Sequence, residues 1–108
     1  MLKLRINPKA VEDLKSIRDY ISNELENPVA AKDTINDIIE AYEKLLYFPC
    51  MGRKLSSKIS IQTDYRYLVC NQYIVFYKCN EEHVSIYRIL SSKRDYLHIL
   101  LIEDNKLH

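Results

Sequence analysis

The sequence predicts an α+β fold in which an antiparallel helical hairpin packs on one face of a small, mainly antiparallel sheet. Two observations predict it. Apolar residues recur at helical spacing through the first half of the chain, whereas runs rich in Val, Ile and Tyr, separated by short polar turns, occupy the second half. With 108 residues, one Gly and three Pro, the chain fits one domain, residues 1–108, built from long elements with few sharp turns.

The chain is expected to begin with a strand, because apolar and basic residues alternate over residues 2–6. Asn7-Pro8 then supplies a helix start, since Asn is a favoured N-cap and Pro fits the first helical position. A helix near residues 8–26 follows. Its apolar face consists of Ala10, Leu14, Ile17, Ile21 and Leu25.

Asn27-Pro28 repeats this start signal, so a second helix is expected to begin almost at once, and Pro49 is expected to end it. The apolar face of this helix consists of Ala31, Ile35, Ile38, Tyr42 and Leu45. Two amphipathic helices joined by so short a turn pack as an antiparallel hairpin.

The second half predicts a loop and then a meander of three strands. Residues 50–64 are polar and basic and are expected to form the loop, with a short strand near Ile59–Ile61. Turns of two or three residues make successive strands antiparallel neighbours. The expected strands are Arg66–Cys70, Tyr73–Cys79 and His83–Leu90, and a short C-terminal helix is expected from Lys93 or Arg94 to about Asp104.

Charge is divided unevenly along the chain. The overall net charge of +1 argues against a uniformly basic protein that coats nucleic acid. Residues 1–50 hold seven basic and nine acidic residues, a net charge of −2, whereas residues 51–98 hold eight basic and four acidic residues, a net charge of +4. The expected sheet therefore carries a local cationic surface, and the hairpin is slightly acidic.

Several kinds of site are not expected. One glycine leaves no phosphate-binding glycine-rich loop or dinucleotide motif. The three cysteines lack a CxxC spacing and the three histidines lack a metal-binding pair, so neither a disulfide framework nor a metal or cofactor site is predicted. No apolar run approaches the roughly 20 residues of a membrane span, and no signal peptide is visible. We expect a protein of the reducing cytoplasm.

Tyrosines are interleaved with basic residues in the expected sheet. This arrangement suits a flexible polyanion, because Arg pairs with phosphate and aromatic rings stack on bases. The alternative is packing, since Tyr favours the half-buried surface of a strand. Alternation places Tyr73, Val75 and Tyr77 on one face and Ile74, Phe76 and Lys78 on the other. Most of these tyrosines are expected to pack in the core.

Several stretches of the chain follow one another in a characteristic order. They are Asn7-Pro-Lys-Ala-Val-Glu-Asp-Leu-Lys-Ser-Ile-Arg-Asp-Tyr-Ile, then Leu46-Tyr-Phe-Pro-Cys-Met-Gly-Arg, then Tyr65-Arg66, Tyr73-Ile-Val-Phe-Tyr77, Val84-Ser-Ile-Tyr-Arg88-Ile-Leu and Lys93-Arg94-Asp95-Tyr96. In this succession, from about residue 2 to residue 101, the chain resembles the RelE/ParE superfamily of bacterial toxins.

The resemblance implies the growth-arresting toxin of a type II toxin–antitoxin module, with a cognate antitoxin as its partner. It leaves two targets open. RelE-like members enter the ribosome and cut mRNA without a metal ion, and this endoribonuclease activity is the main expectation, favoured by the basic, Tyr-rich sheet. ParE-like members are not nucleases and inhibit DNA gyrase by protein–protein contact, here mainly through the hairpin and the tail.

For the RelE-like reaction, the resemblance implies a cationic site that stabilises charge while the ribose 2′-hydroxyl attacks the neighbouring phosphate. The residues expected to act in catalysis are Arg66, Arg88, Arg94 and Tyr96. The residues expected to bind RNA phosphates are Arg53, Lys54 and Lys93. The alternative for each cation is a solvated surface charge. The strand arginine that RelE-like members often carry falls at Ile74, and their terminal tyrosine falls at Leu97.

Overall fold

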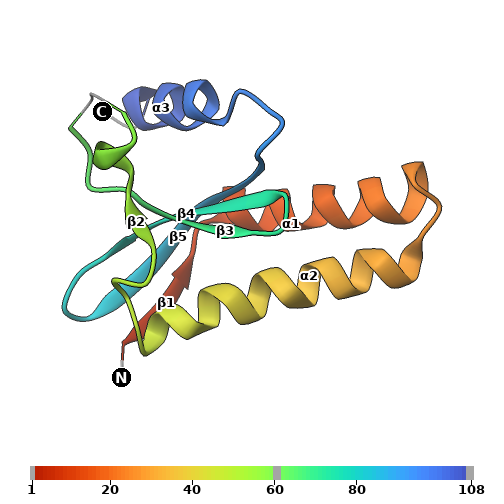
Figure 1. Cartoon of the computed structure of the whole chain (residues 1–108), viewed down its shortest axis with the longest axis horizontal. Coiled ribbons are helices and arrows are strands. Elements are labelled where there is room, and N and C mark those ends of the chain that lie inside the picture. The colour runs from red at the N-terminus through yellow and green to blue at the C-terminus, as the bar shows by residue number, and fades with distance from the viewer. Residues whose placement is uncertain (1, 60–61, 107–108) are drawn as a thin grey trace.

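The computed structural model contains one five-stranded sheet, with the helical hairpin on one face and the C-terminal helix on the other (Figure 1). It describes residues 2–59 and 62–106, with side chains up to residue 102. The helices are α1 (Pro8–Asp19), α2 (Pro28–Glu43) and α3 (Tyr96–Lys106), with a π-helical turn at Tyr20–Glu24 and 3-10 turns at Lys44–Leu46 and Leu55–Ser57. The strands are β1 (Lys3–Ile6), β2 (Arg53–Lys54), β3 (Arg66–Cys70), β4 (Tyr73–Cys79) and β5 (His83–Ser91).

The strands lie in the order β1-β5-β4-β3-β2. The predicted meander is confirmed, since β3, β4 and β5 are successive antiparallel neighbours. The first strand is also confirmed, and it pairs in parallel with β5, with Leu4 opposite Val84. The sheet is therefore mainly antiparallel, with one parallel pair at the β1 edge.

Both predicted helix starts are confirmed. The side chain of Asn7 accepts a hydrogen bond from the backbone N–H of Lys9 at 2.9 Å, and that of Asn27 accepts one from Ala30 at 3.1 Å. These bonds satisfy backbone donors that have no partner inside the first helical turn. The first helix is less regular than predicted, because α1 changes to a π-helical turn after Asp19.

The sheet has a hydrophobic cluster on each face. The cluster against the hairpin includes Ala10, Ile17, Ile38, Tyr73, Val75 and Tyr77. The cluster on the other face consists of Leu55, Tyr65, Ile74, Phe76, Leu90 and Leu100. The predicted division of β4 between its two faces is thus confirmed for its apolar residues. Because α3 supplies Leu100 to the second cluster, it covers the face opposite the hairpin.

The segment after the hairpin differs from the sequence prediction. The short strand lies at Arg53–Lys54, where it pairs with β3, and not near Ile59–Ile61. Ile59 lies in a bend, and residues 60–61 are outside the described residues. The C-terminal helix begins at Tyr96, later than predicted, because the backbone N–H of Arg94 turns back to the Ser91 carbonyl at 3.1 Å.

A buried tyrosine explains where the short strand forms. The hydroxyl of Tyr77, a residue with no solvent exposure, donates to the Pro49 carbonyl at 2.8 Å and accepts from the Gly52 N–H at 3.0 Å. A Cβ atom at Gly52 would lie 2.7 Å from the Tyr67 carbonyl oxygen, so the approach requires glycine. Arg66 Nη1 donates to the Gly52 carbonyl at 2.9 Å. Contacts distant in sequence therefore place the loop against β3.

Replacing Tyr77 by Phe should destabilise the fold by about 1–3 kcal/mol, because a half-buried carbonyl and a buried N–H lose their shared partner. Urea denaturation measures the change as a lower midpoint with an unaltered slope.

The matched control is Tyr47→Phe, which removes a hydroxyl from the same loop at a position 67% exposed. Its effect should stay within about 0.5 kcal/mol. Equal losses in the two variants would show that the Tyr77 hydroxyl does not hold the loop.

Alkaline pH should also destabilise the fold. Burial raises the pKa of Tyr42, Tyr73 and Tyr77 above the ordinary value of 10.0. Between 10.0 and the raised values the unfolded chain loses phenolic protons that the folded chain keeps, so stability falls as pH rises and is unaffected well below this range. The free energy of unfolding measured from about pH 8 to about pH 11 should show this decline, and Tyr77→Phe should make it shallower. A decline unchanged in that variant would contradict the role of Tyr77.

Candidate functional site

Arg88 of β5, a predicted catalytic cation, is held in an ion pair with Asp13 of α1. Arg88 Nε lies 2.7 Å from Asp13 Oδ2, and Arg88 Nη2 lies 2.8 Å from Oδ1. Both side chains are only 11% exposed. This two-pronged geometry is the strong form of a charge-assisted hydrogen bond. The guanidinium therefore joins the hairpin to the sheet and presents little surface to a phosphate from solvent.

Asp13 also replaces a missing strand partner. The pairing of β1 with β5 ends where Ile6 lies opposite Ile86, so the edge of β5 is open beyond that point. There the backbone N–H of Ile89 donates to Asp13 Oδ2 at 2.9 Å. One carboxylate thus satisfies both a guanidinium and a backbone donor that the sheet leaves uncovered.

A β-bulge interrupts the alternation of β5 next to Arg88. Phe76 pairs with Arg88, but the next residue, Tyr77, pairs with Ile86, so Tyr87 is an extra residue in β5. Burial alternates along the first part of this strand and then covers three consecutive residues, 88–90. After the bulge, Arg88 shares the face of its partner Phe76, and Ile89 joins the cluster against the hairpin.

Arg66, Arg53 and Lys54 lie toward the opposite edge of the sheet. Arg66 binds the Gly52 carbonyl, and Lys54 is its direct cross-strand partner. The two edges of the sheet are β1 and β2. The partner of Arg66 lies toward the β2 edge and the partner of Arg88 lies toward the β1 edge, so the two arginines are bound near opposite edges. The structure brings Arg66 and Lys54 together but does not bring Arg88 to them.

The remaining predicted residues follow β5. Lys93 and Arg94 are exposed in the turn, and Tyr96 begins α3 half-buried. The Tyr96 hydroxyl accepts a hydrogen bond from Lys58 Nζ at 2.8 Å, and the Tyr96 ring packs near Phe76, with centroids 5.7 Å apart. This hydrogen bond to Tyr96 is the main cause that raises the pKa of Lys58 above its ordinary value. Tyr96 is thereby oriented toward a lysine.

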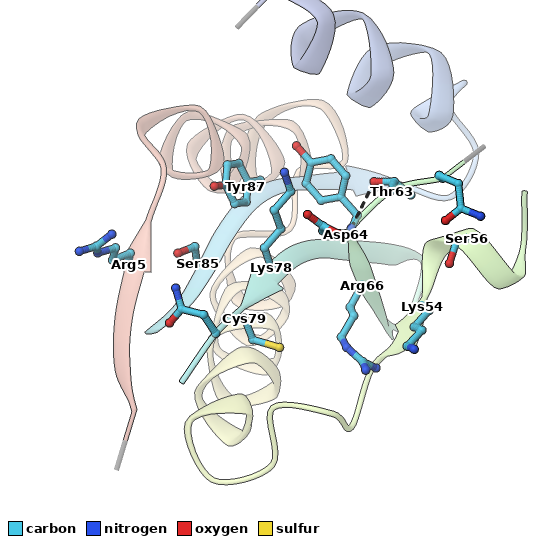
Figure 2. A pocket seen from close by; sticks show the side chains of 13 residues that line it. Arg5, Lys54, Ser56, Thr63, Asp64, Arg66, Lys78, Cys79, Ser85 and Tyr87 are labelled. Carbon is cyan, nitrogen blue, oxygen red and sulfur yellow. Dashed lines mark hydrogen bonds between the residues drawn. The ribbon is translucent and has the colours of Figure 1, made fainter. Parts of the chain in front are cut away.

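A polar pocket of about 630 Å³ opens at the end of the sheet where β3 begins (Figure 2). Its cationic lining comes from four strands: Arg5 of β1, Lys54 of β2, Arg66 of β3 and Lys78 of β4. The lining also includes the carboxylate residue Asp64. In Figure 2, Lys54 and Arg66 lie side by side, Arg5 lies at the far end, and Lys78 stands between them.

Aromatic rings surround Lys78. Its ammonium lies 4.5 Å from the ring centroid of Tyr65 and 5.3 Å from that of Tyr87, and the two rings meet edge to face at 5.5 Å. Lys58 is placed in the same manner, 5.2 Å from the Tyr67 centroid. These cation–π contacts orient both lysines.

Arg5, Lys58 and Lys78 are not among the site residues that the sequence predicts. A signal existed for Lys78, because strand alternation already separated it from the buried face of Tyr77. No signal existed for Arg5, because its neighbour in the sheet is Ser85, 80 residues away in the sequence.

Among the described residues, whose side chains run to residue 102, no group of three His, Cys, Asp or Glu residues is placed to hold a metal ion, and no described helix is long and apolar enough to cross a membrane. Cys50, Cys70 and Cys79 are free thiols. The catalytic and phosphate-binding roles given to the predicted site residues stay predictions.

Comparison with protein families gives a match over most of the chain. The model of a family described as the ParE toxin of type II toxin–antitoxin system, parDE, matches residues 4–96. The matched region runs from β1 through the hairpin and the meander to the start of α3. Comparison with curated proteins gives no match.

Solved structures share the fold. A chain from the chromosomal ParDE toxin–antitoxin system of P. aeruginosa superposes with a TM-score of 0.70 and 24% identity, over 84% of this chain and 96% of the other. YafQ from E. coli strain BL21(DE3) gives a TM-score of 0.50 and 12% identity, over 84% of this chain and 93% of the other. These similarities confirm the predicted α+β architecture.

Replacing Arg88 by Ala should cost about 3 kcal/mol of folding stability, because the nearly buried Asp13 carboxylate loses its charged partner. The matched control is Arg94→Ala, an exposed turn position that should change stability by less than about 0.5 kcal/mol. Urea denaturation of both variants tests this difference. Similar stabilities would show that the ion pair does not join α1 to the sheet.

Proposed function

Because this chain belongs to the ParE toxin family of type II toxin–antitoxin systems, we propose that it arrests growth by binding DNA gyrase and not by cutting mRNA. The gyrase target is what the resemblance to ParE-like toxins implies. The family match thus favours the second of the two expectations drawn from the sequence over the first.

The ion pair that binds Arg88 to Asp13 is the main support for this proposal. Cleavage of RNA by a RelE-like site needs cations that converge on the phosphate where charge develops. Arg88 is bound to Asp13, and Arg66 is bound to the Gly52 carbonyl near the opposite edge of the sheet. Ile74 also stands where RelE-like members often carry a strand arginine.

The closed end of the hairpin offers a surface for a protein target. Three large apolar side chains are exposed there: Tyr20 and Leu25 at 54% each and Val29 at 69%. Exposed apolar side chains that gather in one region mark protein contacts, whereas scattered ones do not. We therefore assign the gyrase contact to this hairpin tip, defined by Tyr20, Leu25 and Val29.

The same family implies a protein that neutralises the toxin. We propose that a cognate antitoxin, encoded by a gene that overlaps or abuts this one, binds the chain and keeps it inactive. Co-expression should restore growth, and the two proteins should co-purify as a complex.

Inducing the toxin in growing cells should raise the DNA-damage response without codon-specific cuts in mRNA. The purified toxin should inhibit supercoiling by gyrase. A DNA-damage reporter, primer extension on an abundant mRNA and the supercoiling assay read these outcomes. Codon-specific cuts with an unchanged DNA-damage response would overturn the proposal in favour of the RelE-like activity.

The hairpin tip is tested by Val29→Asp, which should weaken gyrase inhibition about tenfold by placing a charge in the contact. Val29 lies in the first turn of α2, where an acidic residue suits the helix dipole, so the fold should tolerate the change. The matched control is Val69→Thr on β3, 59% exposed and outside the hairpin. Arg94→Ala should also retain inhibition, whereas a nuclease site that uses Arg94 would lose its activity.

A further inference from the structure

The polar pocket lined by Arg5, Lys54, Arg66 and Lys78, which we call the basic pocket, is separate from the hairpin tip. It is lined by residues of all five strands and of the segment between β2 and β3, and the hairpin lies behind the sheet in the view of Figure 2. A ligand other than the proposed gyrase target can therefore bind in this pocket.

The sheet register explains why the pocket exists. The last pair between β3 and β4 joins Arg66 to Tyr77, but β4 continues through Lys78 and Cys79, which pair only with β5. The chain before Arg66 leaves the sheet at this point. An opening forms beside the end of β4, and polar residues of the neighbouring strands line it.

The charge of the pocket is strongly positive. Arg5, Lys54, Arg66 and Lys78 face a single carboxylate residue, Asp64. Because they stand on strands from one edge of the sheet to the other, the cations are distributed over roughly 19 Å at about 4.8 Å per strand. A ligand with one phosphate meets only part of this row, whereas a ligand with several phosphates meets more of it.

The lining also supplies groups that recognise more than charge. Ser56, Ser85 and Asn80 offer hydrogen bonds, and the half-buried ring of Tyr87 lies beside the Lys78 ammonium. The volume of about 630 Å³ falls in the range of small-ligand sites. Arg pairs with phosphate through two parallel hydrogen bonds, and a tyrosine ring stacks on a base.

We propose that this pocket binds the phosphate groups of nucleotides, supplied either by a free nucleotide or by a nucleic-acid strand. Arg5 and Lys78 contact phosphate directly. Arg66 contributes guanidinium donors beyond the one that binds the Gly52 carbonyl, and Tyr87 lies where a base can stack. This site is independent of the gyrase target.

Binding is measured on the purified chain with two probes: adenosine diphosphate by calorimetry, and a labelled single-stranded decanucleotide by fluorescence anisotropy. Lys78→Gln and Arg5→Gln should each weaken binding about tenfold. Asp64→Asn should strengthen it several-fold, because it removes the carboxylate that opposes phosphate. The matched control is Lys15→Gln, an exposed lysine of α1 outside the pocket, which should leave the affinity unchanged.

The two probes separate the sources of phosphate. Saturable binding of the diphosphate supports a free nucleotide, whereas binding of the decanucleotide alone, with a strong dependence on salt, supports a strand. Absence of saturable binding for both probes overturns the proposal. So does equal competition by a poly-glutamate peptide of the same charge, which would indicate an acidic protein partner.

Asp64→Asn keeps the test decisive if Lys78→Gln disturbs the packing of Tyr65 and Tyr87 around Lys78. Gyrase inhibition, measured separately, shows whether the proposed function fails on its own.

Discussion

The carboxylate of Asp13 joins the two main layers of the molecule. It binds the guanidinium of Arg88 and the backbone N–H of Ile89, so it fixes where α1 lies on β5 and closes the edge that β1 leaves open. Burying two charges costs desolvation, and a buried ion pair is weak support for stability by itself. The Asp13–Arg88 ion pair has its greater effect on how α1 is placed along β5, because a slip of α1 would leave both charges buried without partners. The position of the hairpin depends on this interaction.

The elements themselves could be predicted because each is encoded locally. Asn-Pro pairs start both helices, and the short turns of the meander force antiparallel pairing. Features set by contacts distant in sequence could not be predicted. Arg53–Lys54 forms a strand because the Tyr77 hydroxyl and Arg66 hold Gly52 beside it, although Ile59 belongs to the more strand-like sequence. The bulge at Tyr87 is likewise invisible to a count of alternating residues.

The candidate site was only partly predictable for the same reason. The charge count located the cations in the second half of the chain, and Arg66 with Lys54 indeed line a common pocket. A count of charges along the sequence cannot distinguish a cation that is bound to another residue of the protein from one that faces solvent. Arg88 lies in the basic half yet binds the acidic hairpin, whereas Arg5 lies in the acidic half yet lines the basic pocket. Strand order, and not segment composition, decides which charges meet.

The parallel pairing of β1 with β5 has a consequence for the chain as it is synthesised. Lys3 meets His83 across the sheet, so the first strand waits for its partner until 80 further residues have been synthesised. The entropy of closing such a long loop grows only slowly with its length, but closure cannot begin before β5 exists. A nascent chain that stops before residue 83 also leaves β4 without one of its two neighbours. Translation interrupted between α2 and β5 therefore yields fragments with both hairpin helices and no complete sheet, and the toxin fold first becomes possible once β5 has left the ribosome.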